Sequence, residues 1–213
     1  PPPPPPPFQA EDGIRDPDHS LVGSEMCIRD RRWCATAARI ERVRKEEVML
    51  PLTISTERLT LRQFELRDLD GYIAYYTGPR TAGVGGAKPR HVVVERFYAM
   101  AGQWAIRGYG RYAIDLGGQA IGHVGVLHIE ETAPEMTWSL WDPAFEGRGY
   151  ATEAARAVLS AWSGPRLRAD VDRENTPSIR VAERVGFVED ETAPAPDFMP
   201  NARVFFSPVT VPA

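Results

Sequence analysis

The chain contains a glycine-rich turn that could bind an anion. Residues 147–151 read Gly-Arg-Gly-Tyr-Ala, after a strand-like run and before the helix-forming run TEAARAVLSAW. Two glycines one residue apart let consecutive backbone N–H groups approach a ligand without a Cβ in the way. The helix adds unpaired N–H donors and the positive end of its dipole, and Arg148 adds a cation. This combination indicates a pyrophosphate site, although a lone Gly-x-Gly is also the pattern of an ordinary strand-to-helix turn.

The composition is that of one globular domain, and it argues against binding to nucleic acid, membranes or metals. Of the 213 residues, 43% are hydrophobic and 25% are charged, and a net charge of −4 does not favour nucleic acid. No apolar run reaches the roughly 18 residues of a membrane span, so we expect a cytoplasmic protein without a membrane partner. Both cysteines precede residue 48 and the four histidines lack metal-ligand spacing, so we expect no metal.

The first 48 residues differ in character from the rest. Seven prolines are followed by a segment with little apolar content and no sustained period, which predicts disorder. The strings FQAEDGIRD and GSEMCIRDR resemble translated adapter sequence, which indicates a non-native extension ahead of Met49. A genuine disordered tail is the alternative. We expect the folded domain to comprise residues 49–213.

From residue 49 onward, strand and helix periods alternate in the order βααβββαβαββ. The strands are expected at residues 57–64, 111–116, 119–129, 136–141, 167–171, 187–191 and 203–206. The helices are expected from Leu69 to Gly78, over 92–107, after the glycine turn, and over 177–185. This order predicts an α/β (α+β) fold with a mixed, mostly antiparallel central sheet of about seven strands, flanked by about four helices.

Three details of this pattern bear on the site. Val93, Phe97, Met100 and Trp104 form one helical stripe, which indicates core packing. Residues 78–90 are expected to form a loop. A sheet of this kind can part between two strands, and a ligand at the glycine turn would lie beside the C-terminal end of strand 136–141.

With these elements in view, the chain from about Leu52 to Phe206 resembles the GNAT superfamily of acetyl-CoA-dependent N-acetyltransferases, and within it the ribosomal-protein N-acetyltransferase-like branch. Five landmarks carry the resemblance: ERLTLR at 57–62, GYG at 108–110, IGHVG at 121–125, EGRGYATEA at 146–154 and NTPSIRVAERVGF at 175–187. It implies a GNAT-like acyl-CoA N-acyltransferase fold, split between the strands at 136–141 and 167–171. The chain departs from the family at Glu146, where Gln or Arg is usual; the carboxylate puts a negative charge near two phosphates.

The resemblance also implies acetyl-CoA as the co-substrate and assigns residues to it. The backbone of Ser139, Leu140 and Trp141 would pair with the pantetheine arm like an added strand. Asn175 would hold the same arm from a neighbouring loop. The pyrophosphate would lie on a loop formed by Gly147, Arg148, Gly149, Tyr150, Ala151 and Thr152.

The implied chemistry is direct attack of a primary amine on the thioester, and the amine must be neutral at that moment. Glu135 and Asp170, at positions where relatives place carboxylates, are the candidates for taking the proton; a solvated strand-end charge is the alternative for each. An N–H near Leu140 would meet the oxyanion. Many relatives protonate the leaving thiolate with a tyrosine, whose position here is Ala182. Ser178 is the candidate instead, unless it only satisfies backbone donors at the helix start.

The leading function is therefore transfer of an acetyl group from acetyl-CoA to a primary amine, either a protein N-terminus or a small molecule. A catalytically inactive acyl-CoA-binding module is the alternative, prompted by Glu146 and the missing tyrosine. A nucleotide-binding domain is disfavoured because no GKS or GKT follows the glycines. The sequence is compatible with a monomer or a homodimer.

Overall fold

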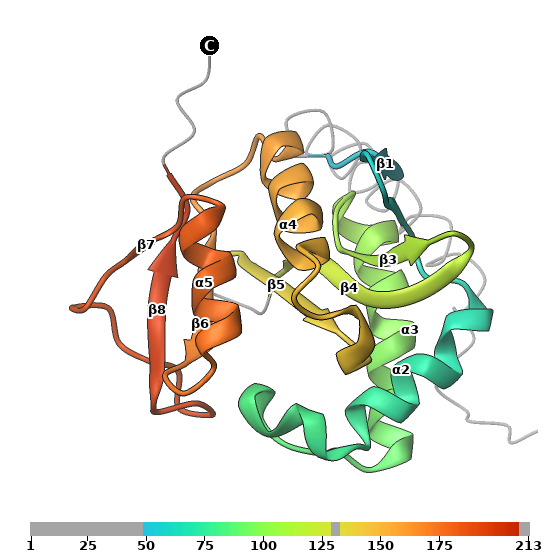
Figure 1. The fold of residues 1–213 in the computed structure, drawn as a ribbon, viewed down its shortest axis with the longest axis horizontal. Coiled ribbons are helices and arrows are strands. Elements are labelled where there is room, and N and C mark those ends of the chain that lie inside the picture. The colour runs from blue at the N-terminus through green and yellow to red at the C-terminus, as the bar shows by residue number, and fades with distance from the viewer. Residues whose placement is uncertain (1–48, 129–132, 209–213) are drawn as a thin grey trace, which may run out of the picture. The chain divides into compact units, whose positions relative to one another are not determined.

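The computed structural model describes residues 49–128 and 133–208, which fold around an eight-stranded sheet of order β1-β2-β3-β4-β5-β6-β8-β7 (Figure 1). The predictions for residues 1–48 lie outside the described residues. The strands are β1 (Thr53–Ser55), β2 (Thr60–Arg62), β3 (Arg111–Leu116), β4 (Gln119–Leu127), β5 (Glu135–Leu140), β6 (Arg168–Asp172), β7 (Val188–Glu189) and β8 (Ala202–Phe206). The α-helices are α2 (Leu69–Tyr76), α3 (Arg90–Arg107), α4 (Tyr150–Ala161) and α5 (Thr176–Arg184). Three short 3-10 helices are η1 (Leu66–Asp68), η2 (Pro79–Val84) and η3 (Pro143–Phe145).

The sheet is antiparallel except between β5 and β6, and there it opens. These two strands pair in parallel at one position only, Glu135 opposite Arg168, and then diverge. β6 instead continues its full pairing with β8 on its other side. Beyond Glu135, the edge of β5 that faces β6 therefore has no strand partner among the described residues. The predicted mixed sheet and the split between these two strands are both confirmed.

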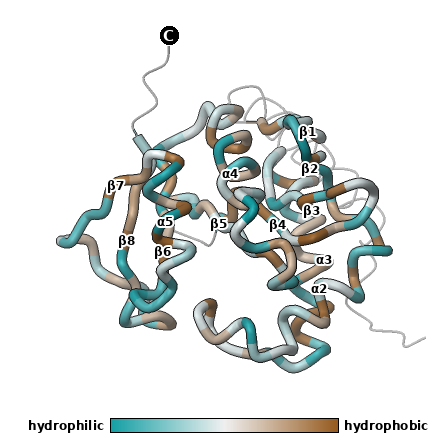
Figure 2. The backbone as a smooth tube through the Cα atoms, viewed as in Figure 1, coloured by the Kyte–Doolittle hydropathy of each residue, from teal (hydrophilic) through white to brown (hydrophobic). Residues whose placement is uncertain are grey.

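Helices cover both faces of the sheet and bury two apolar clusters. In Figure 1, α4 and α5 lie in front of the sheet and α3 lies behind it. Along α4 and α5, hydrophobic and hydrophilic residues alternate, as expected of helices with one buried face (Figure 2). The stripe predicted on α3 is buried, and it packs toward α2 and the sheet. The cluster between α2 and α3 consists of Tyr72, Tyr75, Tyr76, Val93, Phe97 and Met100.

Two expectations about local structure are corrected. The first predicted strand, 57–64, is reduced to Thr60–Arg62, and a separate short strand, Thr53–Ser55, pairs with it at the sheet edge. The segment expected as a loop contains η2, which ends at Gly85 with a left-handed φ of 88°. η2 brings Arg80 and Gly83 to the opening between β5 and β6, where both line a cavity with residues of these strands.

Candidate active site

The glycine turn forms one wall of a cavity of about 810 Å³ at the opening of the sheet. Gly147 and Gly149 have φ values of 71° and 81°, a left-handed conformation in which a residue with a Cβ is strained. A Cβ built on Gly147 would meet nothing within 4 Å, so the backbone there faces open space. Gly149 is the N-cap of α4, and the first N–H groups of that helix are available to an anion.

Arg58, from the segment before β2, fixes the glycine turn to the rest of the fold. Its Nη1 donates to the backbone oxygen of Arg148 at 2.9 Å, and its Nε donates to Glu153 of α4 at 2.7 Å. The guanidinium also lies over the ring of Tyr150, 4.6 Å from its centroid. Arg58, in the 57–62 segment that resembles the family, therefore holds the glycine turn in place. The side chain of Arg148 itself is not among the residues that line the cavity.

Glu146, the residue that departs from the family pattern, is neutralised by a partner that the sequence analysis missed. Arg80 of η2 forms an ion pair with the Glu146 carboxylate. The same guanidinium donates to the backbone oxygen of Leu140, at a distance of 3.3 Å. A cation therefore lies between the end of β5 and the start of the glycine turn, which offsets the negative charge beside the candidate phosphate site.

The hydrogen bonding of β5 determines which backbone groups face the opening. The N–H of Trp141 donates to Ile121 of β4 at 2.9 Å. Because these directions alternate along a strand, the N–H of Ser139 also faces β4, while those of Trp138 and Leu140 face the opening. Of the three residues that the resemblance assigned, only Leu140 thus directs its N–H to the opening, whereas the N–H groups of Ser139 and Trp141 face β4; Trp138 is a further residue whose N–H faces the opening.

At the other side of the opening, Asn175 caps α5. Its Oδ1 accepts from the backbone N–H of Ser178 at 3.2 Å, and its Nδ2 is 3.4 Å from a Cβ built on Gly83 of η2. The Ser178 hydroxyl makes no hydrogen bond to another described residue. Ala182, where many relatives have a tyrosine, is fully buried in the core. Asn175 and Ser178 thus both lie at the opening between β5 and β6, where they line the cavity.

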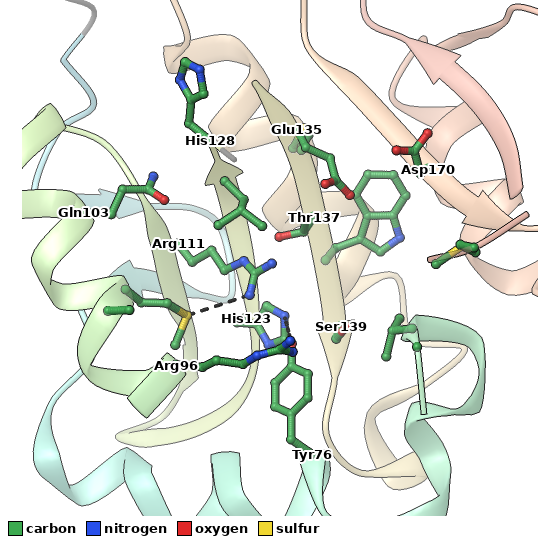
Figure 3. Close-up of a pocket in the computed structure, with 18 of the residues that line it drawn as sticks. Tyr76, Arg96, Gln103, Arg111, His123, His128, Glu135, Thr137, Ser139 and Asp170 are labelled. Carbon is green, nitrogen blue, oxygen red and sulfur yellow. Dashed lines mark hydrogen bonds between the residues drawn. The ribbon is translucent and has the colours of Figure 1, made fainter. Parts of the chain in front are cut away.

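A second cavity, of about 960 Å³, adjoins the first (Figure 3). Its lining includes residues of β3, β4 and β5 and of the helices α2 and α3. The residues that line both cavities are Gly83, Val84, Trp138, Ser139, Asp172, Asn175 and Ser178. A ligand in one cavity would therefore meet a ligand in the other beside the open edge of β5.

Glu135 and Asp170 point into this second cavity from β5 and β6 (Figure 3). Burial raises the pKa of Glu135 to about 7; the Arg111 charge opposes this shift and the Asp170 charge adds to it. Burial also raises the pKa of Asp170, but Arg168 opposes this shift through an ion pair of 2.8 Å. Glu135 forms no ion pair with a described residue. Glu135 is therefore the better placed of the two to accept a proton near neutral pH.

His123, which the sequence analysis did not assign, lies fully buried at the floor of the same cavity. The Trp141 indole donates to its Nδ1 at 3.1 Å, and the Tyr76 hydroxyl is 3.3 Å from its Nε2. Because an indole only donates, Nδ1 must accept, so the neutral ring carries its proton on Nε2 and donates to Tyr76. Burial keeps the pKa of His123 well below its usual value. Both ring nitrogens are thus occupied, and the residue is a fixed part of the wall.

Two further observations concern other kinds of site. Within residues 49–128 and 133–208, no group of three or more His, Cys, Asp or Glu side chains is placed to hold a metal ion. None of the described helices is long and apolar enough to span a membrane.

Comparisons with known proteins agree with this arrangement. Residues 58–188 match the family model of the acetyltransferase (GNAT) domain. A crystal structure of an acetyltransferase from Agrobacterium tumefaciens is 36% identical, with a TM-score of 0.65 over 72% of this chain and 92% of that one. A curated relative, the uncharacterized N-acetyltransferase p20 of Bacillus licheniformis, is 28% identical over 65% of this chain and 83% of its own length.

A ribosomal L7/L12 α-N-protein acetyltransferase has the same fold at 15% identity, with a TM-score of 0.58 over 76% of this chain and 98% of that one. Together with the family match, these similarities identify the class of protein. The chain belongs to the GNAT acetyltransferase family and is an acyltransferase.

Proposed function

We propose that this protein transfers an acetyl group from acetyl-CoA to a primary amine by direct attack on the thioester. One observation carries the proposal: a helix N-terminal glycine turn is continuous with an open strand edge, and that edge adjoins a cavity containing the half-buried carboxylate of Glu135. An acyl-CoA needs the first two features for its pyrophosphate and pantetheine, and an attacking amine needs the third.

In this proposal, acetyl-CoA occupies the cavity beside the glycine turn. The N–H groups of residues 147–152 and the N-terminus of α4 bind the pyrophosphate. The outward N–H groups of Trp138 and Leu140 pair with the pantetheine arm, and the Asn175 side chain holds the arm from the side of β6. The structure of the ribosomal L7/L12 acetyltransferase, a complex with coenzyme A, supports this assignment at the level of the fold.

The chemistry would take place where the two cavities meet. Glu135 accepts a proton from the substrate ammonium, directly or through a water, and the neutral amine nitrogen then attacks the thioester carbon. The N–H of Leu140 or Trp138 donates to the oxygen that becomes negative. When the carbon–sulfur bond breaks, the attacking nitrogen gives up its second proton. The Ser178 hydroxyl hydrogen-bonds the CoA sulfur and passes it a proton, and regains a proton through water from that nitrogen. The products are the N-acetylated amine and CoA.

An experiment on the full chain separates this function from its alternative. Acetyl-CoA binding is measured by calorimetry, and thiol release is followed with a panel of primary amines. We expect binding together with amine-dependent thiol release. Tight binding without release from any amine would instead favour a catalytically inactive acyl-CoA-binding module, and no binding at all would contradict both functions.

A further inference from the structure

A row of three residues crosses the sheet on the side of the larger cavity. Arg111 of β3 is opposite Gly125 of β4, and Gly125 is opposite Thr137 of β5. Directly opposed residues on neighbouring strands share a face of the sheet. Because Gly125 has no side chain, no side chain of β4 stands between Arg111 and Thr137. Figure 3 shows the side chains of both residues at the cavity.

Two hydrogen-bond donors in this row are buried and have no partner. The Arg111 Nε and the Thr137 Oγ1 make no hydrogen bond to any described residue, although both atoms are inaccessible to solvent. The only polar contact of the Arg111 side chain within the described ranges is from Nη1 to the Met100 sulfur, a weak acceptor, at 3.8 Å. No described carboxylate forms an ion pair with Arg111. A buried guanidinium N–H and a buried hydroxyl without partners are both unfavourable, so the row favours a ligand that accepts hydrogen bonds, and the unpaired charge of Arg111 favours a ligand that is negative.

The charges around the cavity are separated in space. Lys88, Arg96 and Arg107 also line it, and Figure 3 labels Arg96 and Arg111 among the side chains at this cavity. Glu135 and Asp170 line the opposite side, toward the split between β5 and β6. A ligand with an amine at one end and an acid at the other matches this distribution. The apolar part of the lining includes Ile106, Leu127, Met136, Phe198 and Met199.

We propose that the acetyl acceptor is a small amine that also carries a carboxylate, such as a free amino acid with an apolar side chain. The carboxylate binds to Arg111 and Thr137, and the amine faces Glu135. Glu135 lies two residues before Thr137 on the same face of β5, about 7 Å along the strand, so only a few bonds separate the two groups of the acceptor. A polyamine or an aminoglycoside would leave Arg111 without an anion. This inference rests on the proposed acetyl transfer.

Matched acceptors test the inference with the full chain. L-methionine, L-methioninamide and 3-(methylsulfanyl)propylamine share one side chain, but only the first carries a carboxylate. Thiol release from acetyl-CoA gives kcat/KM for each, corrected for the fraction of neutral amine. We expect L-methionine to be favoured at least about tenfold, and Arg111→Met to abolish the preference by lowering its kcat/KM roughly 10- to 100-fold. Arg90→Met, an exposed arginine at the start of α3, is the matched control and should change nothing.

Acetyl-CoA binding by Arg111→Met checks that the variant is folded, and Thr137→Val provides a second variant that removes the other donor. Equal or faster acetylation of the two carboxylate-free amines would overturn the inference while leaving acetyl transfer intact.

If no amine reacts, binding of N-acetyl-L-methionine and of its methyl ester is measured with and without CoA. Binding of the acid alone, lost in Arg111→Met, would support the inference; equal binding of the ester, or no binding, would overturn it. A failure of the proposed function would appear separately, either as acetyl-CoA binding without thiol release from any amine or as the absence of acetyl-CoA binding.

Discussion

The ion pair between Arg80 and Glu146 joins η2 to the glycine turn at the smaller cavity, which both residues line. Arg80 also donates to the backbone oxygen of Leu140, at the end of β5. A carboxylate beside a pyrophosphate site is unfavourable on its own, but here a guanidinium from a distant segment accompanies it. The unusual residue and its partner therefore act as a unit, and the Arg80 cation lies where the phosphates of acetyl-CoA are proposed to bind.

Replacing Arg80 should weaken acetyl-CoA binding. In Arg80→Ala, Glu146 is left as an uncompensated negative charge and a phosphate-binding cation is lost, so we expect the Kd for acetyl-CoA to rise roughly tenfold. Arg80→Ala combined with Glu146→Gln should recover at least half of the lost binding free energy. Calorimetric titration measures both. Arg67→Ala, which removes an exposed cation whose ion-pair partner among the described residues is Glu65, should bind as the wild type does. A double variant as weak as Arg80→Ala would show that Glu146 does not oppose the phosphates.

The pKa of Glu135, raised to about 7, should appear in the kinetics. If Glu135 is the base, kcat/KM rises as pH increases through about 7, because only the carboxylate accepts a proton. Glu135→Gln should lower kcat roughly 100-fold or more and remove this ionisation from the pH profile.

Two further variants test the effect of Arg111 on the ionisation of Glu135 and whether Asp170 is the base instead. Arg111→Met should move the ionisation to higher pH, because the Arg111 charge opposes the upward shift. Asp170→Asn should have the smaller effect on kcat, because the Asp170 carboxylate is already paired with Arg168. Wild-type turnover in Glu135→Gln would eliminate Glu135 as the base.

The same half-buried carboxyl should make the stability of the fold depend on pH. The pKa of Glu135 is about 7 in the folded protein against an ordinary value of 4.5, so the folded state holds its proton more tightly. The contribution of Glu135 is therefore fully favourable below about pH 4.5 and is lost as pH rises through about 7. The difference amounts to roughly 3 kcal/mol. Denaturant unfolding at pH 5 and pH 8.5 should show that Glu135→Gln loses less stability than the wild type; parallel losses would contradict the buried location of the carboxyl.

Ser178 is expected to act on the leaving group rather than on binding. Ser178 lines both cavities, and its hydroxyl makes no hydrogen bond within the described ranges, so the hydroxyl is available to donate to the CoA sulfur. Ser178→Ala should lower kcat roughly tenfold while the Kd for acetyl-CoA stays within about twofold. Thr176→Ala removes an exposed hydroxyl from the same helical turn and serves as the control. Unchanged turnover in Ser178→Ala would remove this role.

Much of the fold could be predicted because the relevant signals are local. The α3 stripe of Val93, Phe97, Met100 and Trp104 repeats at helical spacing, and all four side chains are buried. The hairpin between β3 and β4 turns at Gly117 and Gly118, whose positive φ values suit glycine. The short strand β1 could not be predicted, because three residues of edge strand are too few to show a period.

The details of the site depend on contacts between distant segments, which local patterns do not contain. Arg80 meets Glu146 only because η2 packs against the opening of the sheet, 66 positions away in sequence. The row of Arg111, Gly125 and Thr137 follows from the register of three strands, and a shift between Ile114 and Asp115 alters that register further along β3. The buried state of His123 likewise requires α2, β4 and Trp141 together.

A crystal structure of the full chain with CoA tests the central claim most directly. The account predicts the pyrophosphate on the N–H groups of residues 147–152 with Arg80 nearby, and the pantetheine arm alongside Trp138 and Leu140 between β5 and β6. The sulfur should then lie within hydrogen-bonding distance of Ser178. CoA bound elsewhere, or a pantetheine arm that does not enter the split between β5 and β6, would contradict the account.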